Sequence, residues 1–100
     1  MSTLPESRLA DLHLRVGQGL ERVHADTIDE HLEELAHHFG RGHDLARALA
    51  YLERGGSRAA ELGATADAGR LWLRALRVAN RLDDEVSAER VRSRMAGLSP

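Results

Sequence analysis

Histidine is the residue type most worth testing for chemistry here, because six of the 100 residues are His. On a helix, His31, Glu34 and His38 fall at offsets of three and seven, which places three possible metal ligands on one face. Zinc would need a further ligand, for which His13 or His43 is available. We predict that the chain holds no metal or other cofactor, and that His31, Glu34 and His38 are the ligands to test if a metal site exists.

Other catalytic chemistry is poorly represented among the residue types. The chain has no cysteine, and none of its serines stands in the Gly-x-Ser-x-Gly pattern of a nucleophile elbow. Adjacent carboxylates, such as those of Glu33 and Glu34, point in different directions on a helix and so make no acid–base pair. We therefore predict that the protein is not an enzyme and has no catalytic residues.

Arginine makes the clearest polar pattern. Arg70, Arg74, Arg77 and Arg81 recur at steps of four, three and four, which on a helix gives one straight stripe opposite the apolar side. The stripe is typical of a solvated face balanced by carboxylates, of a surface for an acidic protein, or of a surface for nucleic acid. A net charge of −2 and an aromatic content of 3% argue against nucleic acid. We name these arginines as partner-binding residues, together with Tyr51, which otherwise belongs to the core.

Helices must position all of these side chains. Apolar residues recur at steps of three and four in five segments, over about residues 5–24, 28–39, 44–62, 65–82 and 84–96. No run of β-branched residues alternates as a strand would. Short linkers make successive helices antiparallel neighbours. The sequence predicts one all-α domain over residues 1–100, an antiparallel array of about five helices with its core at about residues 5–97.

Two further expectations concern where the helices begin and how the first one faces. Thr3 with Glu6, and Thr27 with Glu30, have the spacing of a capping box, and Asp83 is placed to cap the fifth helix. The first helix is expected to face the core with its apolar stripe, which consists of Leu9, Leu12, Val16, Leu20 and Val23.

Small, large and small apolar residues follow one another twice, a pattern that suits closely packed helices. The pattern is carried by Ala48, Leu52 and Gly55, and again by Ala68, Trp72 and Ala75. It resembles the second helix of a tetratricopeptide repeat (TPR), whose regular period is about 34 residues. Because Ala48 and Ala68 are 20 residues apart, we predict a TPR-like superhelix that is not a regular one. We also expect the third helix to continue through Gly55-Gly56, with a kink as the alternative.

A larger set of residues resembles the helical region of large bacterial signalling ATPases, the STAND-type regulators and the AAA-linked adenylate cyclases. It comprises Leu35-Ala36-His37-His38-Phe39, residues 44–48, residues 51–56, Arg58-Ala59, Gly63-Ala64 and Leu73-Arg74-Ala75-Leu76. The resemblance covers roughly residues 9–82 and implies a scaffold or sensor segment that contacts an inducer, a partner or the rest of its own chain. The sequence has no phosphate-binding Gly-rich Lys-Ser/Thr loop, cyclase module or DNA-reading helix.

These features together favour a non-catalytic TPR-like module for protein interaction, within or derived from an ATPase-linked signalling or transcriptional regulator. No segment has the pattern of a signal peptide or a membrane span, so we expect a cytoplasmic location without a membrane partner. The expected partner is a protein or the remainder of a larger regulator. Two alternatives stay open, a histidine-based metal-binding helical bundle and a homo-oligomerisation domain.

Overall fold

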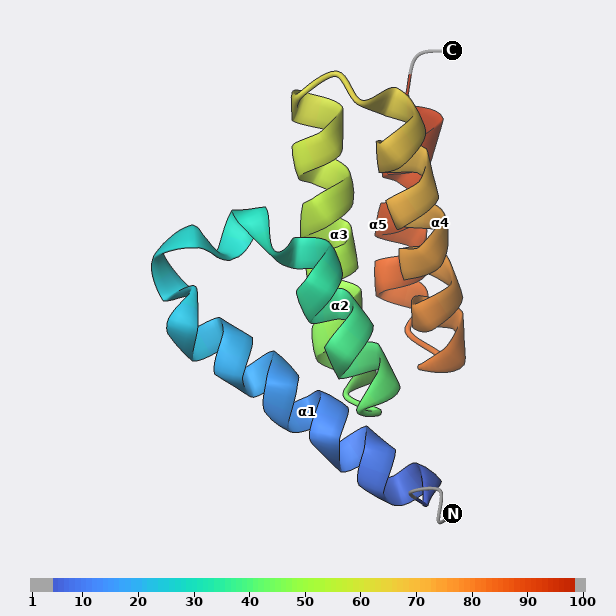
Figure 1. The fold of residues 1–100 in the computed structure, drawn as a ribbon. Helices are drawn as coiled ribbons and strands as arrows, with labels where there is room; N and C mark the ends of the chain where they lie inside the picture. The colour runs from blue at the N-terminus through green and yellow to red at the C-terminus, as the bar shows by residue number, and fades with distance from the viewer. Residues whose placement is uncertain (1–4, 99–100) are drawn as a thin grey trace.

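The computed structural model describes residues 5–98, and in that range the chain is helical throughout with no strand (Figure 1). The helices are α1 (Glu6–Val23), the short 3₁₀ helix η1 (Ala25–Glu30), α2 (Leu32–Arg41), α3 (Leu45–Glu61), α4 (Thr65–Arg81) and α5 (Glu85–Ala96). The predicted all-α class is therefore confirmed, and the one unexpected element is η1.

Helices α2 to α5 form an antiparallel array in which each helix packs against the next one along the chain, and side-chain ion pairs also join alternate helices (Figure 1). Arg70 of α4 donates to Glu33 of α2 at 3.0 Å, and Arg90 of α5 donates to Glu53 of α3 at 2.7 Å. Both pairs are separated by 37 residues along the chain. The array thus has two layers, α2 with α4 and α3 with α5, while α1 crosses the α2 side obliquely.

The same turn joins α2 to α3, α3 to α4 and α4 to α5. Each turn contains one residue with positive φ, at His43 (65°), Gly63 (79°) and Asp83 (54°). The next residue donates its backbone N–H to a carbonyl five positions earlier, in the pairs Asp44 to Phe39, Ala64 to Ala59 and Asp84 to Ala79. The interval from Ala48 to Ala68 is therefore one helix with its turn, whereas the TPR period of about 34 residues counts a pair of helices.

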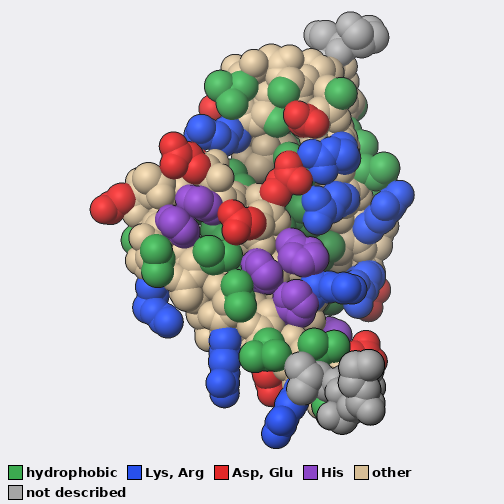
Figure 2. Space-filling model, in the orientation of Figure 1, with side chains coloured by type: hydrophobic (Ala, Val, Ile, Leu, Met, Phe, Trp, Pro, Cys, Tyr) green, Lys and Arg blue, Asp and Glu red, His purple; other side chains and the backbone are tan. Residues whose placement is uncertain are grey.

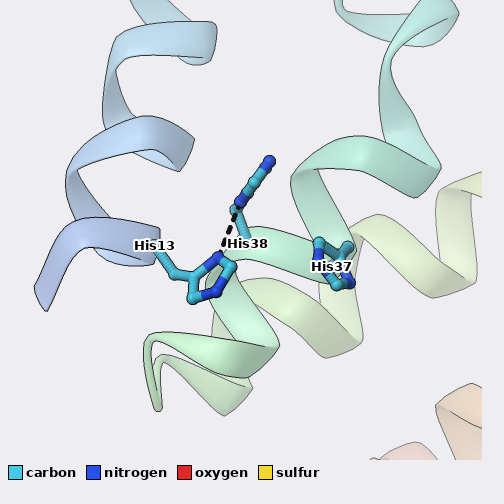
Figure 3. Close-up of side chains that lie close together, drawn as sticks. All are labelled: His13, His37 and His38. Carbon is cyan, nitrogen blue, oxygen red and sulfur yellow. Dashed lines mark hydrogen bonds between the residues drawn. The ribbon is translucent and has the colours of Figure 1, made fainter. Parts of the chain in front are cut away.

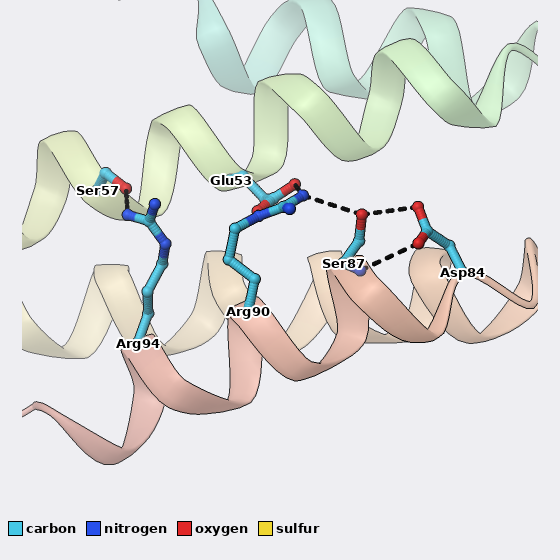
Figure 4. Close-up of polar contacts among 6 residues, drawn as sticks. All are labelled: Glu53, Ser57, Asp84, Ser87, Arg90 and Arg94. Carbon is cyan, nitrogen blue, oxygen red and sulfur yellow. Dashed lines mark hydrogen bonds and ion pairs between the residues drawn. The ribbon is translucent and has the colours of Figure 1, made fainter.

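The cap of α5 corrects one prediction. Asp84, not Asp83, is the N-cap, and its side chain accepts from the backbone N–H of Ser87 at 3.0 Å. Asp83 takes the left-handed conformation of the turn, which Asp tolerates better than most residues because its short side chain bonds locally. Figure 4 shows how this cap continues through Ser87 and Arg90 to Glu53, so that the start of α5 is tied to α3.

Small residues let the helices of the array approach one another. Ala48, Ala68 and Ala88 are evenly spaced along the chain, and each is at most 1% exposed. Helix α3 runs unbroken through Gly55 and Gly56, as predicted. A Cβ on Gly56 would lie 2.3 Å from the indole of Trp72, so the absence of a side chain there makes room for the largest residue of the core.

The predicted core face of α1 is wrong. Leu9, Leu12, Val16 and Val23 are 44–76% exposed, and of the predicted stripe only Leu20 packs against the core. The buried residues of α1 are Ala10 and Gly17. A Cβ on Gly17 would lie 3.1 Å from the Phe39 ring, because α1 approaches α2 closely at this small residue, whereas Leu9 and Leu12 stay exposed.

The start of the second predicted helix also differs. Residues 25–30 form η1, and Thr27 inside it has non-helical angles (φ −132°, ψ 33°), so the Thr27–Glu30 capping box does not form. His31 stands at the N-cap of α2 without a side-chain cap hydrogen bond. Its ring stacks on that of His24 at 3.8 Å between centroids, which draws the two ends of η1 together. The other predicted capping box begins at Thr3, outside the described residues.

Candidate functional site

A groove of about 380 Å³ lies between α2 and α4, with α3 beneath it. Small and apolar residues line part of it, namely Ala36, Gly40, Leu45, Ala48, Leu52 and Val78. Its other lining residues carry basic or imidazole side chains, namely His37 and Arg41 from α2 and Arg74, Arg77 and Arg81 from α4. None of the lining residues is acidic, so the groove combines an apolar surface with positive charge.

The two ends of the arginine stripe differ in their partners. Arg70 makes two hydrogen bonds to the Glu33 carboxylate, at 3.0 and 3.3 Å, and Arg74 lies 3.8 Å from the same carboxylate. Arg70 holds the pKa of Glu33 below its ordinary value through these hydrogen bonds, so the carboxylate stays ionised at neutral pH. At this end of the stripe a carboxylate balances the arginines. This is one of the three interpretations of the stripe that the sequence left open.

The other end of the stripe has no such balance. Within residues 5–98, no carboxylate lies at ion-pair distance from Arg77, Arg81 or Arg41, and all three are exposed. Figure 2 shows arginine and histidine side chains gathered on this face of the molecule. Uncompensated guanidinium groups beside an apolar surface are suited to binding carboxylates of an amphipathic ligand.

Tyr51 lies in the core and not at the groove. It is 9% exposed, its ring stacks on Phe39 at 5.8 Å between centroids, and its hydroxyl donates to the carboxylate of Glu21 on α1. Burial, and after it the bond to Glu21, raises the pKa of Tyr51 to about 12. Tyr51 therefore holds α1 to α3 and is separate from the groove-lining arginines.

Tyr51 is the only tyrosine in the chain, which makes its ionisation directly observable. We expect a tyrosinate absorbance titration at 295 nm to have its midpoint near pH 12, against about 10 in the unfolded chain. Because folding favours the protonated hydroxyl, its contribution to stability is complete below pH 10 and is lost as the pH rises from 10 towards 12. Glu21→Gln should lower the midpoint, and a wild-type midpoint near 10 in folded protein would contradict the expectation.

The predicted metal ligands are not brought together. His31 lies 3.2 Å from Glu34, whereas His38 points to α1, where its Nδ1 is 3.0 Å from Nδ1 of His13 (Figure 3). His37 completes this second group, and the three histidines each have a ring nitrogen within 4.8 Å of the others. We call His13, His37 and His38 the histidine cluster.

The histidine cluster and the groove share His37, which lines both. Partial burial lowers the pKa of His38, and the neighbouring His37 and His13 lower it further. The ring of His38 is therefore neutral at pH 7, with a nitrogen lone pair available. The helical spacing predicts His38 as a ligand and offers His13 only as a further one. The sequence does not reveal their proximity, because α1 and α2 meet through a packing that the apolar pattern of α1 does not indicate.

Comparisons with protein-family models, with curated proteins and with solved structures find no match to this chain. In residues 5–98, no helix combines the length and the apolar character that crossing a membrane requires.

Proposed function

We propose that the protein is a non-catalytic interaction module whose groove between α2 and α4 binds an acidic, amphipathic segment of a protein. The observation that carries this proposal is the set of three arginines, Arg41, Arg77 and Arg81, around the groove without carboxylate partners among the described residues. The apolar lining would receive the apolar side chains of the segment, and the guanidinium groups would pair with its carboxylates.

Two features favour a protein ligand over nucleic acid. Glu33 neutralises the far end of the arginine stripe, so the positive charge is confined to one short groove and does not extend as a track for a phosphate backbone. The apolar part of the groove is made of alanine, glycine, leucine and valine, which pack against side chains, and no Phe, Tyr or Trp lines the groove as a platform for bases.

The arrangement of the helices supports a TPR-like interpretation. Alternate helices share a layer, and the ion pair Glu33–Arg70 recurs one helix further along the chain as Glu53–Arg90. We therefore propose that the array continues the TPR-like superhelical geometry predicted from the sequence. We propose that it works within, or derives from, an ATPase-linked signalling or transcriptional regulator, whose own remainder is one possible source of the acidic segment.

Charge reversal at the free arginines tests the proposal. A peptide array of acidic amphipathic sequences, with scrambled and lysine-substituted counterparts, should select acidic peptides for the wild-type protein. The double variant Arg77→Glu/Arg81→Glu should weaken binding of the selected peptides by about ten-fold or more, because like charges then face each other. Fluorescence anisotropy of the selected peptides gives the dissociation constants.

Arg92→Glu is the matched control, because Arg92 is an exposed arginine of α5 whose carboxylate partner, Glu89, is in the same helix. It should bind the peptides as the wild type does. Equal binding by the double variant, or displacement of the peptides by a single-stranded oligonucleotide, would contradict the proposal. Sedimentation velocity on the same samples separates peptide binding from self-association through the exposed leucines of α1.

A further inference from the structure

Three imidazole rings from two different helices meet in the histidine cluster. His13 comes from α1, whereas the adjacent residues His37 and His38 come from α2 (Figure 3). The ring centroids are 5.1–5.5 Å apart. The cluster is a product of tertiary packing, since His13 reaches the other two only where α1 crosses α2.

The spacing of the ring nitrogens suits a tetrahedral metal ion. Zn²⁺ binds histidine nitrogens at about 2.0–2.1 Å, which places two such nitrogens about 3.3 Å apart in a tetrahedral site. The observed separation is 3.0 Å between Nδ1 of His13 and Nδ1 of His38, and the ligand atoms of all three residues lie within 4.8 Å of one another. Small side-chain rotations would bring the three ligand nitrogens to the separation of about 3.3 Å that a tetrahedral site needs. His37 is exposed and free to rotate.

The surroundings leave room for a fourth ligand. His13 also lines an open pocket of about 440 Å³, shared with Glu6 and Arg41. A water molecule can reach the histidines from this side and complete four-coordination, as in zinc sites with three protein ligands. The cluster contains no carboxylate or thiolate, and three imidazoles favour zinc and its neighbours in the first transition row over Mg²⁺ or Ca²⁺.

We propose that His13, His37 and His38 bind one divalent transition-metal ion of the zinc type, which cross-links α1 to α2. The ion replaces the contact between two ring nitrogens that otherwise need a shared proton. It adds a cross-link to α1, whose buried residues are Ala10 and Gly17 and whose Leu14 and Leu20 are partly buried against the core. This site stands on different residues from those that carry the proposed function, except that His37 borders the groove as well.

The test is metal binding by the full chain without a histidine tag. Titration with Zn²⁺ followed by calorimetry should give one ion per chain, and Co²⁺ should give the visible absorption of a tetrahedral site. Mg²⁺ should give no binding. At a Zn²⁺ concentration of about 100 times the dissociation constant, the melting temperature should rise by on the order of 10 °C.

Substitutions locate the site. His37→Ala removes an exposed side chain, so the fold should persist while Zn²⁺ affinity falls by at least about ten-fold. His13→Ala should have the same effect on affinity. His31→Ala is the matched control, because it removes a histidine outside both the cluster and the pocket beside His13, and it should bind Zn²⁺ as the wild type does.

Circular dichroism of each variant separates loss of a ligand from loss of the fold. Absence of 1:1 binding by wild-type protein, or unchanged Zn²⁺ affinity in folded His37→Ala, would overturn the proposal. An equal loss of Zn²⁺ affinity in His31→Ala would do the same. The variant Arg77→Glu, whose side chain does not line the pocket beside His13, should retain Zn²⁺ binding, so failure of the groove proposal and failure of the metal site are distinguishable.

Discussion

Phe39→Ala is expected to lower the free energy of unfolding by about 3–5 kcal/mol, because it removes a fully buried aromatic ring from the centre of the array. The ring touches two other helices. It lies against the backbone of α1 at Gly17. On α3 it stacks on Tyr51, and the Arg47 guanidinium of the same helix lies over it at 5.1 Å from the centroid. No other side chain is placed to fill the space, since Gly17 offers none.

Urea denaturation followed by far-UV circular dichroism measures this loss, with the slope compared between variants to check two-state unfolding. Leu73→Ala is the matched control, because Leu73 lies on an adjacent helix and is 40% exposed. Leu73→Ala should lower the free energy of unfolding by well under half as much as Phe39→Ala does. A loss below about 1 kcal/mol in Phe39→Ala would show that α1 and α2 do not pack around this ring.

Gly56→Ala is expected to destabilise the protein by about 2–3 kcal/mol, although alanine is the better helix former by about 1 kcal/mol. The added methyl group would lie 2.3 Å from Cδ1 and Nε1 of Trp72. It is fixed to the backbone and cannot rotate away, and Trp72 is 4% exposed and cannot leave its site without opening the contact between α3 and α4. Overpacking of this severity outweighs helix propensity.

Gly19→Ala is the control for this substitution, because Gly19 is also helical but a Cβ there has no atom within 4 Å. It should stabilise the protein by up to about 1 kcal/mol through helix propensity alone. Thermal melts of the two variants should therefore move in opposite directions from the wild type. A shift upward in both would mean that Trp72 does not pack on Gly56.

Much of the array follows from the sequence. The bounds of α3, α4 and α5 lie within one residue of the predicted segments, because each helix lies between turn residues and α3 and α4 carry broad apolar faces. The burial of Ala48 and Ala68 was also predictable, since small residues at helical spacing mark close helix contacts. For α1 the same reasoning failed, because most of its predicted apolar stripe is exposed, whereas Ala10 and Gly17 are buried and Leu14 and Leu20 are partly buried beside them.

The 20-residue repeat of one helix with its turn can be recognised only in part from the sequence. The interval between Ala48 and Ala68 corresponds to one helix with its turn, whereas a TPR period counts two helices, and the buried Ala88 completes the series. Glu33 and Glu53 have the same interval, as do Arg70 and Arg90. Their meaning depends on the tertiary arrangement, in which successive helices make the main packing contacts and these ion pairs join alternate helices.

The candidate site could be predicted only in part. Helical spacing alone finds Arg77 and Arg81, because they belong to one helix. Arg41 and His37 join them only when α2 lies beside α4, and His13 joins His37 and His38 only when α1 crosses α2. Sites assembled between helices depend on the packing angles, which the apolar periodicity of single helices does not determine.

The turns after α2, α3 and α4 share one conformation, and this affects how such a chain can gain helices. An in-frame duplication of one helix with its turn, for example 45–64, adds one helix together with its own turn. The existing turns keep their conformation. Each added copy of 45–64 also supplies another Glu53 to pair with an arginine two helices further on, whereas the position that corresponds to Arg70 and Arg90 is Ala50. The array can therefore be lengthened by tandem duplication of one helix with its turn, without any change in the type of turn that joins successive helices.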